Sequence, residues 1–189
     1  MRLGFMFSSK DDSALSRRIC SVVDGSRSHA MIRIETNDGQ EEYWESWHKK
    51  DELTGKDGVR GPRSMADLLA WEQESEKHHL TIQDYLPLTA GEVLTAYAKL
   101  LWARENIEYA HVQLGLNWFH NRLHIRLGSR LGSSQKWHCS ETGLRVLPPR
   151  LWPEFMIPDI IADMVTPSGE FGLMEHAAAV LRGHGTHGI

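Results

Sequence analysis

One cysteine and one histidine have the residue types and settings of a thiol nucleophile and its base. Cys139 opens an apolar-periodic segment after residues 132–138, and His29 begins a strand-like stretch over residues 29–34. A thiolate is the reactive form of cysteine, and a helix N-terminus or a nearby imidazolium lowers the thiol pKa enough to populate it. The two residues stand 110 positions apart (139 minus 29). Only the fold can bring them together, as is usual for a nucleophile and its base.

Each of these residues also has a purely structural interpretation. Free cysteine is among the most buried residue types, so Cys139 could simply fill space in the core. A histidine such as His29 at a strand start is commonly a polar terminus, although its ordinary pKa near 6.5 suits a base. Glu45 follows two other glutamates and fits a solvated strand face. It could equally accept the second ring N–H of His29 and fix the tautomer, as the third member of a triad does.

A metal site is the competing chemistry. The possible ligands are His78 with His79, His120 with His124, and His138 with Cys139. No Glu follows His120 as it would in a zinc-protease helix, and the chain has no Cys-x-x-Cys pair. We therefore expect no metal and no cofactor.

Composition bounds the class of protein. With 189 residues, 41% of them hydrophobic and 24% charged, the chain fits one domain over 1–189. We expect a core of about 1–150, an extension over 151–189 and a loose tail over 183–189. The net charge of −4 and the scattered basic residues do not indicate a nucleic-acid partner.

The sequence also bears on location. No run approaches the roughly 20 apolar residues of a membrane span, and the first residues lack the features of a signal peptide. Two cysteines are too few for a disulfide framework and fit a reducing compartment. A cytoplasmic location is the expectation, and the oligomeric state is left open.

A β-hairpin is predicted to position the histidine and the glutamate. One strand is expected over 29–34 and a second over 42–47, and the sequence Asn37-Asp38-Gly39 between them is a strong turn signal. The hairpin would place His29 and Glu45 on neighbouring strands.

Helices are expected to complete an α+β fold. Thr89 and Glu92 form a capping box ahead of a helix to about residue 105. Another helix starts near Cys139 and runs through residue 147, before two prolines. The other expected elements are a short helix over 11–23, a charged and Gly-rich surface loop over 49–63, a short helix over 64–73, and a strand over 79–85.

Four segments, taken in order, resemble the circularly permuted branch of the NlpC-type papain-like cysteine hydrolases. The nearest members are the YiiX/YebB-like proteins, and lecithin–retinol acyltransferase is a more distant relative. Ser28-His29 opens a segment similar to the family's "S-H-h-g-I" strand, and Tyr43-Trp44-Glu45-Ser46 with Gly58-Val59 resembles its "v-i-E-A … G-V" pattern. Residues 105–110 stand where the family has "G-x-x-Y-D". The segment Trp137-His138-Cys139-Ser140-Glu141 matches its "W/Y-x-C-S-E" nucleophile motif. The permuted branch places His before Cys, as this chain does.

This resemblance implies a papain-like core, in which a small antiparallel sheet carries the histidine and a polar third residue, and the cysteine opens a packed helix. By position, Cys139 is the nucleophile, His29 the base and Glu45 the residue that orients it. The residues implied to line the site or secure the helix start are Ser28, Tyr109, Trp137, His138, Ser140 and Glu141. The implied reaction is hydrolysis or acyl transfer at an amide or ester bond of a cell-wall peptide or a lipid acyl group.

The chain departs from the family pattern at two aspartates. None follows Gly4 in the first strand, and Ala110 stands where an Asp is expected after Tyr109. His48 is a rival for the third position, but it lies three residues after Glu45 and would face the other way in a strand. The alternative function is a catalytically silent papain-like scaffold that binds a peptide or lipid, or a structural protein of an assembly.

Overall fold

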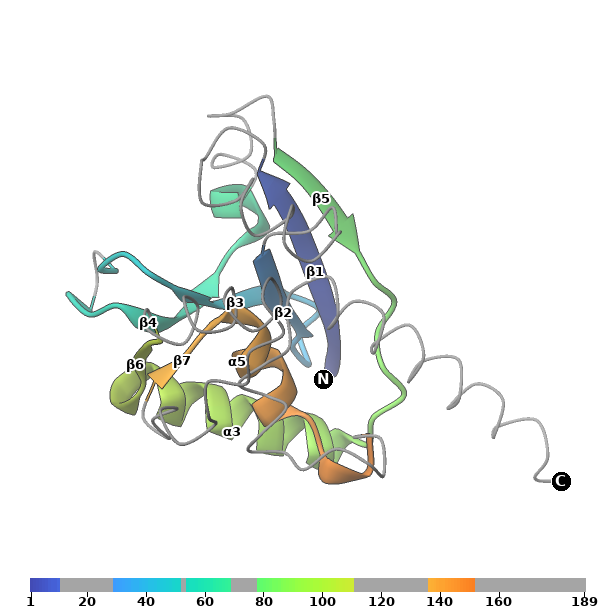
Figure 1. The fold of residues 1–189 in the computed structure, drawn as a ribbon. Helices are drawn as coiled ribbons and strands as arrows, with labels where there is room; N and C mark the ends of the chain where they lie inside the picture. The colour runs from blue at the N-terminus through green and yellow to red at the C-terminus, as the bar shows by residue number, and fades with distance from the viewer. Residues whose placement is uncertain (11–28, 52–53, 69–77, 111–135, 152–189) are drawn as a thin grey trace, which may run out of the picture.

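A computed structural model of the chain describes residues 1–10, 29–51, 54–68, 78–110 and 136–151 (Figure 1). The predicted helix over 11–23, much of the one over 64–73, and the extension over 152–189 lie outside these residues, as do Ser28, His120 and His124. Within them the protein has an α+β fold, made of a small antiparallel sheet and helices.

The sheet has five strands in the order β4-β3-β2-β1-β5, and every neighbouring pair is antiparallel. The strands are β1 (Arg2–Lys10), β2 (His29–Glu35), β3 (Glu41–Trp47), β4 (Gly58–Arg63) and β5 (His78–Ile82). The predicted hairpin is confirmed as β2 and β3. Gly39 has a φ of 78° in its turn, a left-handed conformation that favours glycine.

The two faces of the sheet bury different sets of side chains. Alternate residues of β1 and β2 enter the main core, because successive side chains in a strand point to opposite faces; they are Leu3, Phe5, Phe7, Ala30, Ile32 and Ile34. The opposite face holds a smaller cluster of Met6, Met31, Tyr43 and Leu68. Burial on both faces explains why the strands read as apolar runs with little strict alternation.

Two helices lie together on one side of the sheet (Figure 1). The longer, α3 (Ala90–Asn106), begins at the predicted capping box of Thr89 and Glu92 and buries Val93, Ala96, Leu100 and Ala103. The shorter, α5 (Cys139–Val146), adds Leu144, Val146 and Leu147 to the main core and leads to the short 3₁₀ helix η2 (Pro149–Leu151). Full burial of such an aliphatic side chain contributes roughly 1.5–3 kcal/mol, so this core anchors α5.

A pair of short parallel strands lies beside the start of α5. They are β6 (Glu108–Tyr109) and β7 (Lys136–Trp137), and both contact β4. Figure 1 shows them at the end of α3, next to β4. The segment that leads into α5 is therefore held by regular backbone pairing on one side.

One predicted element is wrong. The segment over 49–63 was expected to be a surface loop because of its glycines and charges, but residues 58–63 form β4 and pair with β3. Gly58 and Gly61 both have positive φ, at 119° and 140°. Their missing side chains make room for the backbone of Ile107 and the ring of Trp44. These glycines therefore allow close packing within a strand where they had indicated a surface loop.

The last strand of the sheet is shorter than predicted. Strand β5 ends at Ile82, whereas the pattern predicted a strand to residue 85. The chain beyond it still bonds to β1, from the amide of Gln83 to the carbonyl of Phe5 and from that of Leu86 to the carbonyl of Leu3. Residues 65–68 are helical, as expected for that part of the predicted short helix.

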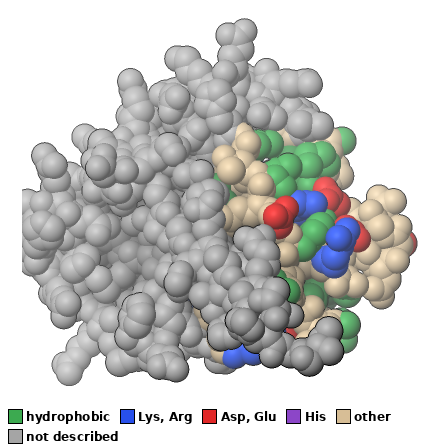
Figure 2. Space-filling view, turned by 90° about the vertical axis from the view of Figure 1, so that its right-hand side faces the viewer, with side chains coloured by type: hydrophobic (Ala, Val, Ile, Leu, Met, Phe, Trp, Pro, Cys, Tyr) green, Lys and Arg blue, Asp and Glu red, His purple; other side chains and the backbone are tan. Residues whose placement is uncertain are grey.

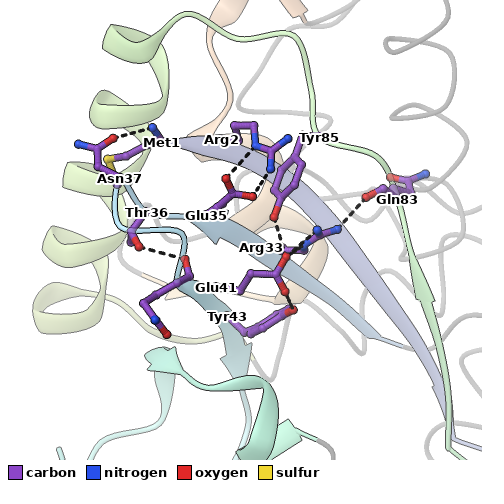
Figure 3. Close-up of polar contacts among 11 residues, drawn as sticks. Met1, Arg2, Arg33, Glu35, Thr36, Asn37, Glu41, Tyr43, Gln83 and Tyr85 are labelled. Carbon is purple, nitrogen blue, oxygen red and sulfur yellow. Dashed lines mark hydrogen bonds and ion pairs between the residues drawn. The ribbon is translucent and has the colours of Figure 1, made fainter.

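A polar network closes the end of the sheet near the hairpin turn (Figure 3). The Tyr85 ring contacts two guanidinium groups, with Arg2 4.3 Å and Arg33 4.1 Å from its centroid. The carboxylate of Glu41 accepts hydrogen bonds from Arg33, from Tyr43 Oη at 2.6 Å and from Tyr85 Oη at 2.7 Å. The network ties β1, β2, β3 and the segment after β5 together at the end of β2 that is remote from His29.

The charged side chains on the visible surface are mixed in sign. Figure 2 shows acidic and basic groups next to one another on the described part of one face, with no histidine visible among them. Within the described residues, no helix is long and apolar enough to cross a membrane.

Candidate active site

The hairpin register brings His29 and Glu45 together. His29 is the first residue of β2, and the pairing of Met31 with Glu45 places the glutamate diagonally across from it on the same face of the sheet. His29 Nε2 lies 2.5 Å from Glu45 Oε2, and the side chains are only 10% and 4% exposed. The ring N–H donates to the carboxylate, so this bond sets both the tautomer and the orientation of the imidazole.

Cys139 occupies the first position of α5 and is a free, buried cysteine. Its thiol lies beside the ring of His29, and each of the two groups shifts the pKa of the other. Because Glu45 occupies Nε2, Nδ1 is the ring nitrogen left for the sulfur. The structure thus arranges sulfur, imidazole and carboxylate in sequence.

The environment favours a thiolate–imidazolium pair. Burial by itself lowers the pKa of His29, but hydrogen bonds to Cys139 and Glu45 outweigh it and raise the pKa to about 9. For Cys139, burial alone would raise the pKa, yet hydrogen bonds with His138 and His29 hold it well below the ordinary thiol value. Opposite charges that are buried together stabilise each other in this way.

His138 caps helix α5. Its Nδ1 accepts a hydrogen bond from the amide of Glu141 at 3.4 Å, and its own amide donates to Glu141 Oε2 at 3.4 Å, which completes a capping box. An Nδ1 that accepts leaves the neutral ring's proton on Nε2. His138 was predicted from the sequence to line the site, but its capping role was not predicted. The signal was present, because Glu141 lies three residues after His138, which is the spacing of a capping box.

Two arginines of β4 contact the buried carboxylate of Glu45. Arg60 Nε lies 2.8 Å and Arg63 Nη1 3.0 Å from Glu45 Oε1, the oxygen that does not face His29. Burial raises the pKa of Glu45, but the bond and charge of His29 and the charges of Arg60 and Arg63 lower it to about 2. Neither arginine was identified from the sequence, because β4 was taken for a loop.

Aromatic rings surround the histidine and the thiol. Trp47 and His29 meet edge to face at 5.2 Å between ring centroids, and the guanidinium of Arg60 lies over the Trp47 ring, 4.7 Å from its centroid. Tyr109 is buried, and its pKa is raised by burial and by the nearby charges of Cys139 and Glu45. Tyr109 therefore lies at the site, where the sequence placed it.

The remaining predicted residues have the following positions. His48 follows the end of β3 and packs between Trp47 and Tyr109, at 4.9 and 6.1 Å, whereas Glu45 makes the hydrogen bond to His29. Trp137 is buried next to Trp102, at 6.1 Å. Glu141 is fully buried and bonds Arg145 at 2.6 Å. Ser140 belongs to α5, and Ser28 lies outside the described residues.

No group of three or more His, Cys, Asp or Glu side chains among the described residues is arranged to hold a metal ion. Comparison of the chain with protein-family models and with curated proteins finds no match.

Proposed function

We propose that the protein is a cysteine hydrolase or acyl transferase that acts on an amide or ester bond. The observation that carries the proposal is the buried His29–Glu45 hydrogen bond together with the interaction between His29 and the Cys139 thiol. A nucleophile that contacts a base, which in turn contacts an orienting group, is the general arrangement of nucleophilic catalysis.

The reaction has two steps. The Cys139 thiolate attacks the carbonyl carbon, and the imidazolium of His29 gives its proton to the departing amine or alcohol, which leaves a thioester on sulfur. Water then attacks the thioester while neutral His29 takes its proton, and the acid departs with the thiolate restored. The backbone amide of Cys139, at the first turn of α5, would donate to the oxyanion in both steps.

The order of the elements supports a permuted papain-like fold. The histidine and the glutamate come first, on adjacent strands β2 and β3, and the cysteine follows at the start of α5. This is the chain order of the family that the sequence motifs resemble. That resemblance is also the basis for the substrate class, a cell-wall peptide or a lipid acyl group.

One observation favours the second candidate, a catalytically silent scaffold. Cys139 is only 6% exposed, so a carbonyl group could reach the sulfur only after surrounding side chains move. A buried thiol with no productive access would be retained for packing, and the protein would bind its peptide or lipid without turnover.

Alkylation of Cys139 tests the proposal. With Cys20→Ser as background, iodoacetamide should react at pH 6 at a rate within about tenfold of that at pH 8.5, since the thiolate is already formed. In His29→Ala the thiol pKa should rise toward 8.5 while the interaction with His138 remains, and the rate at pH 6 should fall by roughly 10- to 100-fold. His48→Ala is the matched control and should leave the profile unchanged.

The outcomes separate the two candidates. A thiol that titrates near 8.5 in both the parent and His29→Ala would contradict the hydrolase. An activated thiol would justify incubation with p-nitrophenyl esters and a search for the acyl adduct on Cys139 by intact mass. An adduct that turns over would rule out the silent scaffold.

A further inference from the structure

Strand β4 has one extra residue where it pairs with the stretch of β3 from Tyr43 to Glu45. Tyr43 pairs with Arg63 and Glu45 pairs with Arg60, so two steps along β3 correspond to three along β4. In a regular strand, residues 60 and 63 would point to opposite faces, because their separation is odd. The extra residue at 61–62 reverses the alternation, and both guanidinium groups reach the same carboxylate. Bulges often re-aim side chains next to active sites in this way.

The packing around Gly61 maintains this irregularity. A Cβ atom on Gly61 would lie 2.7 Å from the ring of Trp44 and 2.8 Å from the carbonyl oxygen of Tyr43. Trp44 is fully buried in the main core. The bulge is therefore built into the core, and the positions of Arg60 and Arg63 follow from it.

The two arginines and His29 bind different oxygens of the Glu45 carboxylate. Both bind Oε1 of Glu45, which leaves Oε2 for the imidazole. Glu45 is 4% exposed, whereas Arg60 and Arg63 are 16% and 25% exposed. The carboxylate is thus buried behind cations that retain some contact with water, an arrangement that satisfies a buried charge at low desolvation cost.

The proposed reaction explains why Glu45 needs a charged partner besides His29. His29 is positively charged in the resting pair and neutral when it acts as a base toward water. If His29 were the sole partner of Glu45, each loss of the imidazolium charge would leave a buried, unpaired carboxylate. Such a carboxylate favours proton uptake and keeps the imidazole charged.

We propose that Arg60 and Arg63 are positioning residues that hold Glu45 as a carboxylate independently of His29 and so allow His29 to release its proton. The inference rests on the proposed function for its catalytic meaning, since it concerns the base of that site. The arginines touch no reacting atom and act only through Glu45.

The direction of the expected effect follows from the charges around His29. The described titratable and charged side chains around it come from β3, β4, β6 and the start of α5; they are Glu45, Arg60, Arg63, Tyr109, His138 and Cys139. Among these groups the arginines carry fixed positive charges that oppose the imidazolium. Removal of either charge should therefore raise the pKa of His29.

The test measures the pKa of His29 by NMR with ¹⁵N-labelled histidine in Cys139→Ser protein, so that the thiol does not contribute. The His29→Asn variant assigns the resonance. Arg60→Gln and Arg63→Gln, which keep an amide donor, should each raise this pKa by about half a pH unit or more, and the double variant should raise it further. Arg63→Lys keeps the charge and should restore the parent value to within about 0.2 pH units.

Arg33→Gln is the matched control. Arg33 is as buried as Arg60, at 15% exposure, but its carboxylate partner is Glu41. An unchanged or lowered pKa of His29 in the Arg60 and Arg63 variants, or an equal rise in Arg33→Gln, would overturn the inference. If the double variant does not fold, the single variants decide, since each keeps one arginine on Glu45. Because the thiol is absent, this result is independent of the alkylation test.

Discussion

Ser46 Oγ donates a 2.8 Å hydrogen bond to the carbonyl oxygen of Trp137, 91 residues further along the chain. Ser46 follows Glu45 in β3, and Trp137 stands two residues before Cys139. Both partners are buried, with Ser46 fully enclosed. This bond therefore joins the strand that carries Glu45 to the segment that leads to Cys139.

Ser46→Ala should reduce the reactivity of Cys139 more than its effect on stability implies. The carbonyl of Trp137 keeps the amide of Ala110 as a donor at 3.3 Å, so the free energy of unfolding should fall by only about 1 kcal/mol. The alkylation rate at pH 6 should fall several-fold, because the thiol is less well held against His29. Urea unfolding and alkylation in one buffer measure both quantities.

Thr142→Val is the control for that prediction. Thr142 also donates from a buried hydroxyl to a carbonyl, that of His138 at 3.0 Å, and this carbonyl keeps a backbone donor as well. Its bond lies within α5 and does not join the helix to the sheet. Similar losses of reactivity in both variants would show that the contact between β3 and the segment before Cys139 has no special role.

Two substitutions of His138 should separate its role as the cap of α5 from its effect on the pKa of the Cys139 thiol. His138→Asn retains a good N-cap residue but removes the imidazole beside the thiol, whereas His138→Ala removes both. We expect His138→Ala to lower the free energy of unfolding by about 1 kcal/mol and His138→Asn to lower it much less. Both should raise the pKa of Cys139, since its hydrogen bond to His138 is lost. Equal thiol titrations in the parent and His138→Asn would exclude an electrostatic role for the ring.

The pH dependence of stability reports the ion pair directly. In the unfolded chain the His29 pKa is near 6.5 and the thiol pKa near 8.5. In the folded protein the His29 pKa is about 9 and that of Cys139 is well below the ordinary value. Between pH 6.5 and 8.5 the pair therefore holds one proton in either state, on His29 when folded and on sulfur when unfolded. Its contribution to stability should be flat across this range.

The free energy of unfolding of the Cys139→Ser variant should depend on pH over this range. Glu45 still raises the folded pKa of His29, so its stabilising contribution is complete below pH 6.5 and is lost as the pH rises through the folded pKa. The free energy of unfolding of the parent, minus that of the variant, should grow by up to about 1.4 kcal/mol per pH unit from 6.5 to 8.5. Urea unfolding at four pH values measures the difference, and parallel curves would mean that the folded thiol is not ionised.

Gly61→Ala should be far more destabilising than Gly39→Ala. Both glycines have positive φ, but an added Cβ meets nothing within 4 Å at Gly39 and meets the buried ring of Trp44 at Gly61. We expect a loss of about 1 kcal/mol at Gly39 and roughly 2–4 kcal/mol at Gly61, where overpacking adds to backbone strain. Denaturant midpoints at constant m-value test this. Comparable losses of stability at the two positions would mean that the Trp44 ring can shift at little cost in free energy.

The parts of the site that follow local rules could be predicted from the sequence. The Asn37-Asp38-Gly39 turn sets the hairpin register, and that register places Glu45 beside His29. The α3 helix follows from the capping box at Thr89. In both cases the determining residues are adjacent in sequence, so short-range patterns are sufficient.

The parts that depend on tertiary packing could not be predicted. Gly58 and Gly61 read as turn residues, and only their contacts with Ile107 and Trp44 explain a strand there. The role of Arg60 and Arg63 depends on a one-residue difference between paired strands, which no single segment reveals. His138 was noticed as a neighbour of the cysteine, but its ring nitrogen is an unusual cap that preference scales for serine, threonine and aspartate do not rank.

The irregular step in β4 also suggests how such a site is lost during evolution. Deletion of one residue at 61–62 would restore regular alternation and turn Arg63 to the other face of the sheet. The cysteine, histidine and glutamate would all remain in the sequence. Among divergent descendants of this chain, the odd spacing between the two arginines would then show which copies keep both guanidinium groups on Glu45, whereas the presence of the cysteine, histidine and glutamate would not.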